Sequence, residues 1–302
     1  MADNVLLLGG GFIGQALAKR LAENDQSVTV ISRSTPEHLT KGINWLQGDL
    51  GDTTLMRKQL SECRAVVHLA STSTPGHHVY APTHEAEENL LPLLHLLEMM
   101  GDHVNIPLVF MSSGGAIYGH PVTLPVSETH ALAPLSNHAA GKAAAEHFLG
   151  VFSHQGHPVT ILRPSNIYGQ YQPLKAGFGI IRTILEHLNR GTSMTIWGDG
   201  KIVRDYLYID DLISACLAVL EDPSVGTFNI GSGLGYSINE LCMLAEKVTG
   251  KALDLRYEPA RSVDVRKVVL DNMAIRNRYG WQPQFTIEQG IHLTWKWLQK
   301  LP

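Results

Sequence analysis

Short apolar runs alternate with segments of helical period through the first half of the chain. The runs are bounded by Gly, Asn or Asp and predict strands over 5–8, 27–32, 44–47, 65–69, 108–112 and 159–163. Between them, apolar positions three and four apart predict helices over 12–24, 55–60, 85–100 and 137–154. Strands that alternate with helices are typical of βαβ units, so the pattern predicts an α/β fold with a doubly wound parallel sheet.

The pattern becomes irregular after about residue 169. Clusters such as GDGKIVRDY and EPARSVDVRK predict a smaller α/β lobe that closes over the carboxyl edge of the sheet. We therefore divide the chain into a first domain, 1–169, and a C-terminal lobe, 170–302. No change of composition marks a linker, so we expect the two to be interwoven. The stretch LLPLLHLLEMM (90–100) is apolar around most of its circumference, which predicts burial in the core or in a subunit interface.

Composition narrows the classes of protein. With 302 residues, 44% hydrophobic and 17% charged, the chain can bury the core of two lobes. A net charge of −4 without a run of Lys or Arg argues against a nucleic-acid partner. The first residues lack the features of a signal peptide, and no later segment is apolar over the length of a membrane span. We therefore expect a cytoplasmic location and no membrane partner.

The cysteines and histidines give no sign of a metal site. The three cysteines are odd in number and share no CxxC spacing, so we interpret them as buried thiols: Cys63, Cys216 and Cys242. Three of the 15 histidines lie close together without a ligand spacing such as HExxH, and we interpret them as loop residues: His77, His78 and His84. We predict no bound metal.

A glycine turn follows the first predicted strand. In LLLGGGFIG, Gly9, Gly11 and Gly14 have the GxGxxG spacing and open a helix. A tight turn, a close approach of the backbone to a pyrophosphate and close helix–strand packing each need a glycine, and the helix N-terminus attracts the anion. The alternative is a glycine-rich turn with a purely structural role.

The end of the second strand bears on the choice of dinucleotide. Where an acidic residue would bind the ribose 2′-hydroxyl of NAD, the chain has Ser32, Arg33 and Ser34. A cation with flanking hydroxyls suits a 2′-phosphate, which favours NADP over NAD. NAD stays open if Arg33 stacks on adenine or is simply solvated. After the third strand, Asp49 is placed to accept from the adenine amino group, and Asp52 is a candidate helix N-cap.

An ordered set of motifs covers nearly the whole chain. It comprises GGGFIG (9–14), QGDL (47–50), VVHLAS (66–71), Asn89, SSGGAIYG (112–119), Lys142, LRPSNIYG (162–169), IWGDGKIVRDYLYIDDL (196–212), FNIGSG (228–233), Arg261 with Asp264, and TWKW (294–297). With this set the chain resembles the extended short-chain dehydrogenase/reductase family, in its nucleotide-sugar epimerase/dehydratase branch. The closing TWKW is similar to sugar 4-epimerases.

The resemblance implies a Rossmann-type lobe that binds the dinucleotide, a C-terminal lobe that binds a nucleoside-diphosphate sugar, and a homodimer. The likeness to 4-epimerases implies that this sugar is linked to UDP. Within its motifs, the dinucleotide contacts would also include Phe12, Ile13, Leu50, Leu69, Ala70 and Lys142.

The resemblance also assigns residues to the sugar nucleotide: Thr72, Asn166, Arg204, Arg261 and Val268. Asn166 would contact the diphosphate, and Arg204 and Arg261 would clamp it, which suits the forked geometry of guanidinium groups. An ion pair of Arg204 with Asp205 or Asp210 is the alternative. A small residue at Val268 would leave room for an N-acetyl group.

The chain departs from this family at the catalytic positions. Relatives place a Tyr four residues before the Lys, which exchanges the proton of the sugar hydroxyl, and a Ser or Thr after the fifth strand that bonds the same oxygen. Here the Tyr position is His138, the hydroxyl positions are Gly114 and Ala116, and Lys142 is retained.

Three hypotheses follow from the departures. His138 is itself the acid/base, because imidazole exchanges protons near neutrality. Alternatively, a hydroxyl from Ser112, Ser113, Thr72 or Thr74 completes a rebuilt site around it. In the third, the chain only binds dinucleotide and sugar nucleotide, and His138 is a packed helix residue.

The sequence as a whole favours an NAD(P)-dependent UDP-hexose or UDP-N-acetylhexosamine 4-epimerase, in which His138, Lys142 and Ser113 are the candidate catalytic residues. An NADPH-dependent 4-keto-sugar reductase and the binding module are the alternatives.

Overall fold

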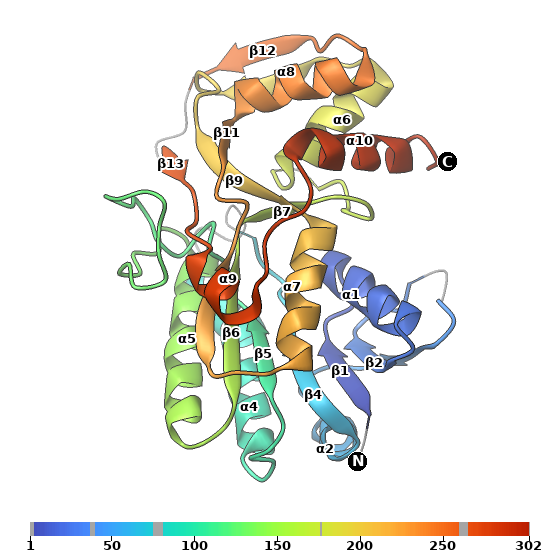
Figure 1. Cartoon of the computed structure of the whole chain (residues 1–302), viewed down its shortest axis with the longest axis vertical. Helices are drawn as coiled ribbons and strands as arrows, with labels where there is room; N and C mark the ends of the chain where they lie inside the picture. The colour runs from blue at the N-terminus through green and yellow to red at the C-terminus, as the bar shows by residue number, and fades with distance from the viewer. Residues whose placement is uncertain (1–2, 37–39, 75–80, 176, 260–264, 302) are drawn as a thin grey trace.

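A computed structural model describes residues 3–36, 40–74, 81–175, 177–259 and 265–301. The chain builds a lower part around one large sheet and an upper part of helices and short strands (Figure 1). The N-terminus lies at the bottom, and the C-terminal helix α10 (Ile287–Leu298) lies in the upper part.

The large sheet has seven parallel strands in the order β10-β6-β5-β4-β1-β2-β3. Their bounds are β1 (Asn4–Leu8), β2 (Ser27–Ser32), β3 (Ile43–Gln47), β4 (Cys63–His68), β5 (Leu108–Met111), β6 (Val159–Pro164) and β10 (Gly226–Ile230). The six strands predicted from apolar runs are all present, and their ends differ by at most two residues. The seventh strand, β10, comes from the second half of the chain. The boundary between 169 and 170 stays a prediction.

Helices cover both faces of this sheet. One buried cluster holds residues of α1 (Phe12–Glu23) and α7 (Ile209–Glu221), and the other holds residues of α2 (Thr53–Ser61), α4 (Leu91–Met100) and α5 (Asn137–His154). Asp52 caps α2 by accepting from the Leu55 amide at 3.0 Å, as predicted. Five of the eleven residues in the apolar stretch 90–100 are buried within this chain's own core, whereas Leu91, His95 and Glu98 are exposed.

The helix predicted over 85–100 is interrupted. A short α3 (Pro82–Glu85) passes into a π-helix, η1 (Ala86–Leu90), before α4 begins. Pro92 lies in the first turn of α4 and has no amide hydrogen for the carbonyl of Glu88, four residues earlier. The wider π turn accommodates this missing bond and turns Glu88 and Asn89 toward the sheet edge.

The upper part is more regular than the sequence pattern predicted. Its strands are β7 (Asn166–Tyr168), β8 (Met194–Trp197), β9 (Val203–Tyr208), β11 (Gly235–Ser237), β12 (Leu255–Glu258) and β13 (Lys267–Val268). Its helices are α6 (Ile180–Arg190), α8 (Ile238–Thr249) and α10, while α9 (Met273–Tyr279) lies beside β10. Full capping boxes start α8 and α10, with Ser237 and Glu240 in the first and Thr286 and Gln289 in the second. These helices and strands agree with the smaller α/β lobe that the sequence predicts after residue 169.

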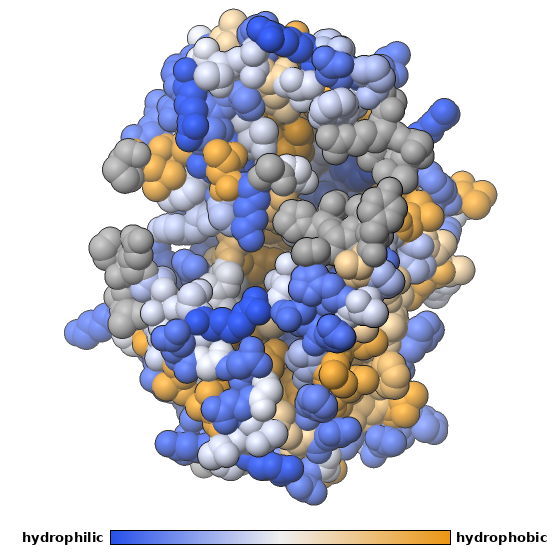
Figure 2. Space-filling model, turned by 180° about the vertical axis from the view of Figure 1, so that it is seen from behind, coloured by the Kyte–Doolittle hydropathy of each residue, from blue (hydrophilic) through white to orange (hydrophobic). Residues whose placement is uncertain are grey.

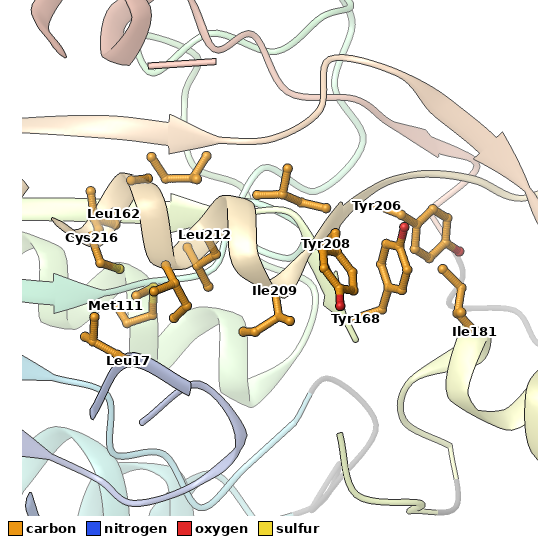
Figure 3. Close-up of a cluster of buried hydrophobic side chains, with 14 of the residues drawn as sticks. Leu17, Met111, Leu162, Tyr168, Ile181, Tyr206, Tyr208, Ile209, Leu212 and Cys216 are labelled. Carbon is orange, nitrogen blue, oxygen red and sulfur yellow. The ribbon is translucent and has the colours of Figure 1, made fainter. Parts of the chain in front are cut away.

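One hydrophobic core joins the two parts. Tyr168, Tyr206 and Tyr208 lie close together where β7 pairs with β9 (Figure 3). From there α7 carries Leu212 toward Leu17 of α1 and the ends of β5 and β6. Because the core is continuous, the upper part is held in a fixed position above the carboxyl edge of the large sheet.

The cysteines agree with their interpretation as buried thiols. All three cysteines are free and buried, and burial raises the pKa of the Cys63 and Cys242 thiols to about 11. Over the described ranges, no helix combines the length and the apolar character that crossing a membrane requires. The cytoplasmic location stays a prediction.

Candidate active site at the carboxyl edge of the sheet

The strand order reverses between β1 and β4, because the chain runs from β1 outward to β3 and then returns to the other side of β1. Loops diverge at such a switch point and leave a crevice at the carboxyl ends of the strands. A pocket of about 360 Å³ lies there, lined by the loop segments 9–11, 31–34, 48–50 and 69–72 and by Glu87, Glu88 and Pro92. Seen from behind, the surface is hollowed between the upper and lower parts (Figure 2).

The glycine turn fits a dinucleotide pyrophosphate. Gly9 has φ +115°, and a Cβ there would lie 2.7 Å from the Ala70 amide nitrogen. A Cβ on Gly14 would lie 2.0 Å from the Gly9 carbonyl oxygen. A Cβ on Gly11 would meet nothing within 4 Å, and Gly11 caps α1 without a side-chain hydrogen bond. Two glycines are thus required by close packing, and the third leaves open space at a helix N-terminus, where an anion is favoured.

Most of the predicted dinucleotide contacts line this pocket. They are Gly9, Gly11, Arg33, Asp49, Leu50, Leu69 and Ala70, together with Thr72 from the predicted sugar-nucleotide set. Phe12, Ile13 and Gly14 follow in the first turn of α1.

Arg33 has a partner that the sequence did not reveal. Its Nη1 lies 3.3 Å from a carboxylate oxygen of Glu88, and its side chain is 64% exposed. Glu87, Glu88 and Asp49 also line the pocket, so Arg33 is set among acidic groups. This surrounding charge lowers the attraction that Arg33 alone would exert on a 2′-phosphate.

His138 lies in the first turn of α5, which Ser136 caps by accepting from the Ala139 amide. The ring is buried, and its Nδ1 lies 2.9 Å from Oγ of Ser73 in the loop after β4. Burial, and then the nearby charge of Lys142, lower the pKa of His138 to about 4. The ring is therefore neutral near pH 7 and able to exchange a proton with a ligand.

Lys142 follows one turn later and is also buried. Its Nζ donates to the Met111 carbonyl at the end of β5, 2.8 Å away, and lies 4.7 Å from the Phe110 ring centroid. Burial lowers the pKa of Lys142 to about 8, against the opposing effect of Glu85 and Glu146. This ammonium group thus sits at the carboxyl edge of the sheet with His138 on the same helix face.

Two of the four hydroxyls considered for the site bond other residues. Ser112 donates to Glu146, and the Thr72 hydroxyl donates to Asn89 Oδ1 at 3.3 Å. Ser113 is half-buried, and its carbonyl accepts from the Ala116 amide at 3.1 Å. The described hydroxyl that touches His138 is instead that of Ser73, which the sequence analysis missed. Its neighbours Thr72 and Thr74 were considered, so the loop was identified but not the residue.

Three of the residues predicted to contact a sugar nucleotide belong to strands of the upper part: Asn166, Arg204 and Val268. Asn166 begins β7, and its Nδ2 donates to the Asp205 carbonyl at 2.9 Å. Arg204 is half-buried in β9, and its Nη1 donates to the Val203 carbonyl at 3.0 Å. Val268 is buried in a cluster that includes Ala139, next to His138. Arg261 lies outside the described residues.

The two carboxylates considered as ion-pair partners of Arg204 have other partners. The Asp205 carboxylate accepts from the Ser232 hydroxyl at 2.7 Å and from backbone amides around it. Asp210 lies 3.7 Å from Arg20. Histidines 77 and 78 lie outside the described residues, and within those that are described no group of three His, Cys, Asp or Glu side chains is arranged to hold a metal ion.

A doubly wound sheet, a glycine turn at its switch point and a buried His–Lys pair beside the crevice define a dinucleotide-binding protein with acid/base groups. The model of the NAD dependent epimerase/dehydratase family matches residues 5–231. The chain belongs to that family.

Individual relatives are similar to this chain over nearly its whole length. The chain is 30% identical to a putative UDP-glucose 4-epimerase of Methanocaldococcus jannaschii over 301 residues, 98% of each chain. The structure of a UDP-glucose 4-epimerase of Thermotoga maritima with UDP-glucose is similar with a TM-score of 0.93 and 33% identity, covering 98% of this chain and 99% of that one. The structure of a UDP-glucose 4-epimerase of Thermus thermophilus in complex with NAD is similar with a TM-score of 0.91 and 31% identity, covering 98% of this chain and 99% of that one. The predicted family and Rossmann-type fold are confirmed.

The buried histidines make the fold sensitive to acid. His68 ends β4 with neither ring nitrogen bonded among the described residues, and burial with the charge of Lys142 lowers its pKa to about 3. His68 and His138 stay neutral in the fold, while in the unfolded chain they take up protons below about pH 6.5.

We therefore expect the free energy of unfolding to be unaffected by these rings above pH 6.5. It should fall between pH 6.5 and 4 by up to about 1.4 kcal/mol per pH unit for each ring. Urea titrations at a series of pH values measure how the free energy of unfolding depends on pH. His68→Leu should reduce this dependence by the contribution of one ring, whereas His154→Gln, at an exposed position, should leave it unchanged. Equal slopes for all three proteins would contradict the assignment to His68.

Proposed function

We propose that this protein is an NAD(P)-dependent UDP-sugar 4-epimerase that uses His138 as its acid/base in place of the usual tyrosine. The observation that carries the proposal is the buried, neutral His138 one helical turn before Lys142, beside the dinucleotide pocket. The full-length similarity to UDP-glucose 4-epimerases supports the choice of reaction and of UDP-linked substrates.

The chain's own residues perform the proton steps in this proposal. A bound nicotinamide dinucleotide supplies the acceptor and donor of the hydride at C4. His138 exchanges the proton of the C4 oxygen through Nε2, because its other nitrogen faces Ser73. A pKa of about 4 makes this imidazole a weaker base than a free one, so we expect modest turnover.

Lys142 and the upper lobe provide binding. Lys142 holds positive charge next to the ring of His138, which disfavours the imidazolium and keeps the base available. Asn166, Arg204 and Arg261 bind the diphosphate of the sugar nucleotide, and Val268 leaves space beside the sugar. Two protomers associate through α4 and α5, where Phe148 and Val151 are exposed.

Turnover of UDP-sugars tests the proposal directly. UDP-glucose, UDP-galactose and their N-acetylamino counterparts are incubated with the protein, and the products are separated and identified. We expect 4-epimers of at least one pair, and a loss of about 100-fold or more in kcat for His138→Phe, with binding of UDP-sugar retained. His154→Gln, at the exposed end of the same helix, should be as active as the wild type.

Two other results would replace the proposal. Consumption of NADPH with a 4-keto-sugar nucleotide, without epimerisation, would identify a one-way reductase. Binding of UDP-sugar and dinucleotide with no turnover in the wild type would identify a binding module.

The open space at Gly11 gives a test of dinucleotide placement. Because a methyl group at Gly11 meets no protein atom within 4 Å, Gly11→Ala should change the thermal midpoint of unfolding by no more than about 2 °C. The same methyl group would stand where the pyrophosphate approaches the helix, so calorimetric titration should show at least about 10-fold weaker dinucleotide binding. Unchanged binding in a folded Gly11→Ala protein would place the pyrophosphate elsewhere.

The preference for NADP depends on the balance between Arg33 and Glu88. We propose that Arg33 leaves Glu88 to bind the 2′-phosphate of NADP, with Ser32 and Ser34 as flanking donors. Glu88→Gln, which removes the competing charge, should then strengthen NADP binding several-fold and hardly change NAD binding. Arg33→Gln should weaken NADP binding alone. If neither variant alters the ratio of the two dissociation constants, Arg33 does not select the coenzyme.

A further inference from the structure

Position 114 has no room for the hydroxyl that the family pattern places there. A Cβ on Gly114 would lie 2.7 Å from the Arg163 carbonyl oxygen and 2.7 Å from a methyl carbon of Leu270. The first of these atoms belongs to the backbone of β6 and cannot move aside cheaply. A serine or threonine at 114 is therefore excluded by packing, and a hydroxyl for the acid/base group has to come from another segment.

The loop after β4 brings a hydroxyl to the His138 ring. Ser73 is 8% exposed, and its Oγ lies 2.9 Å from Nδ1 of His138, 65 residues further along the chain. With Nδ1 facing Ser73, Nε2 is the nitrogen that can exchange a proton with a ligand.

Asn89 holds Ser73 from the other side. Its Oδ1 accepts from the Thr72 backbone amide at 2.8 Å, and a backbone amide can only donate. The orientation of the side-chain amide is therefore fixed, and Nδ2 is the atom that faces Ser73 Oγ, at 3.3 Å. Asn89 belongs to the π-helical turn η1, which turns its side chain toward this loop. The result is a chain of hydrogen bonds from the Thr72 amide through Asn89 and Ser73 to His138.

We propose that Ser73, held by Asn89, is the positioning residue that orients the ring of His138 toward the sugar oxygen; this rests on the proposed function. A hydroxyl suits the task because its oxygen can accept from the ring without carrying a charge. It accepts from Nδ1–H when Nε2 is the free base, and it still accepts from Nδ1–H after Nε2 has taken the proton of the sugar hydroxyl and both ring nitrogens are protonated. Either form presents the same ring orientation, as an epimerase that works in both directions requires.

A carboxylate at this place would act differently. It would also accept from Nδ1–H, but it would stabilise the charged ring, which raises the pKa of a histidine. The neutral partner leaves the pKa of His138 low, in agreement with the pKa of about 4 that burial and Lys142 give it.

Two serine variants test the role by kinetics. Ser73→Ala removes the bond to Nδ1, and we expect kcat with UDP-sugar to fall about 3- to 10-fold, the worth of one neutral hydrogen bond, with KM nearly unchanged. Ser73→Thr keeps the hydroxyl and should restore most of the rate. Ser61→Ala, a remote serine at the exposed end of α2, is the matched control and should equal the wild type.

Nuclear magnetic resonance tests the same role without turnover. The ¹⁵N shifts of the His138 ring nitrogens, assigned by their loss in His138→Phe, report which nitrogen is bonded and protonated. Ser73→Ala should shift the Nδ1 resonance while Ser73→Thr keeps it near its wild-type position. Asn89→Asp replaces the donor Nδ2 by an acceptor oxygen at equal size and should shift Nδ1 in a protein whose Ser73 is intact.

The outcomes separate this proposal from the proposed function. An unchanged Nδ1 resonance in Ser73→Ala, or equal kcat for Ser73→Ala and the wild type, would overturn the role of Ser73. If the wild type turns over no UDP-sugar, the proposed function fails, and the resonance of Nδ1 in the Ser73 and Asn89 variants still decides whether the ring is held as described.

Discussion

The close backbone approach between the turn after β1 and the end of β4 is the constraint on which the site depends. Gly9 packs against the Ala70 backbone, and Gly14 packs against the Gly9 carbonyl. This contact sets α1 directly on the sheet, with its amide groups facing the crevice at the switch point. It also fixes where the loop after β4 begins, and so places Thr72 and Ser73 between the pocket and α5.

The surroundings of His138 show how a histidine is accommodated at this position. An imidazole at 138 is buried and kept neutral beside Lys142, and the crowded backbone at Gly114 excludes a hydroxyl from its usual side. In our proposal Ser73 provides it from the opposite loop. In the family pattern a tyrosine and a neighbouring serine or threonine bond the sugar oxygen. Here the His138 imidazole would exchange the proton through Nε2, while Ser73 bonds Nδ1.

The π turn η1 connects the two ends of the crevice. Glu88 pairs with Arg33 at the end of β2, and the next residue, Asn89, bonds Thr72 and Ser73. Two adjacent residues of one turn thus contact the end of β2 and the loop after β4, which lie on different sides of the crevice.

The sequence by itself determined the strands, the glycine turn and the family motifs, because these depend on local periodicity and on residues close together in the chain. It also gave His138 and Lys142 by their spacing, whereas the helices α8 and α10 with their capping boxes were not predicted. Only the tertiary structure decided that β10 completes the large sheet, that Glu88 neutralises Arg33 and that Ser73 reaches His138. The residues that these contacts join are 55 to 66 positions apart in the sequence. Which side chains meet over such separations is set by the packing of whole elements, and no local pattern records it.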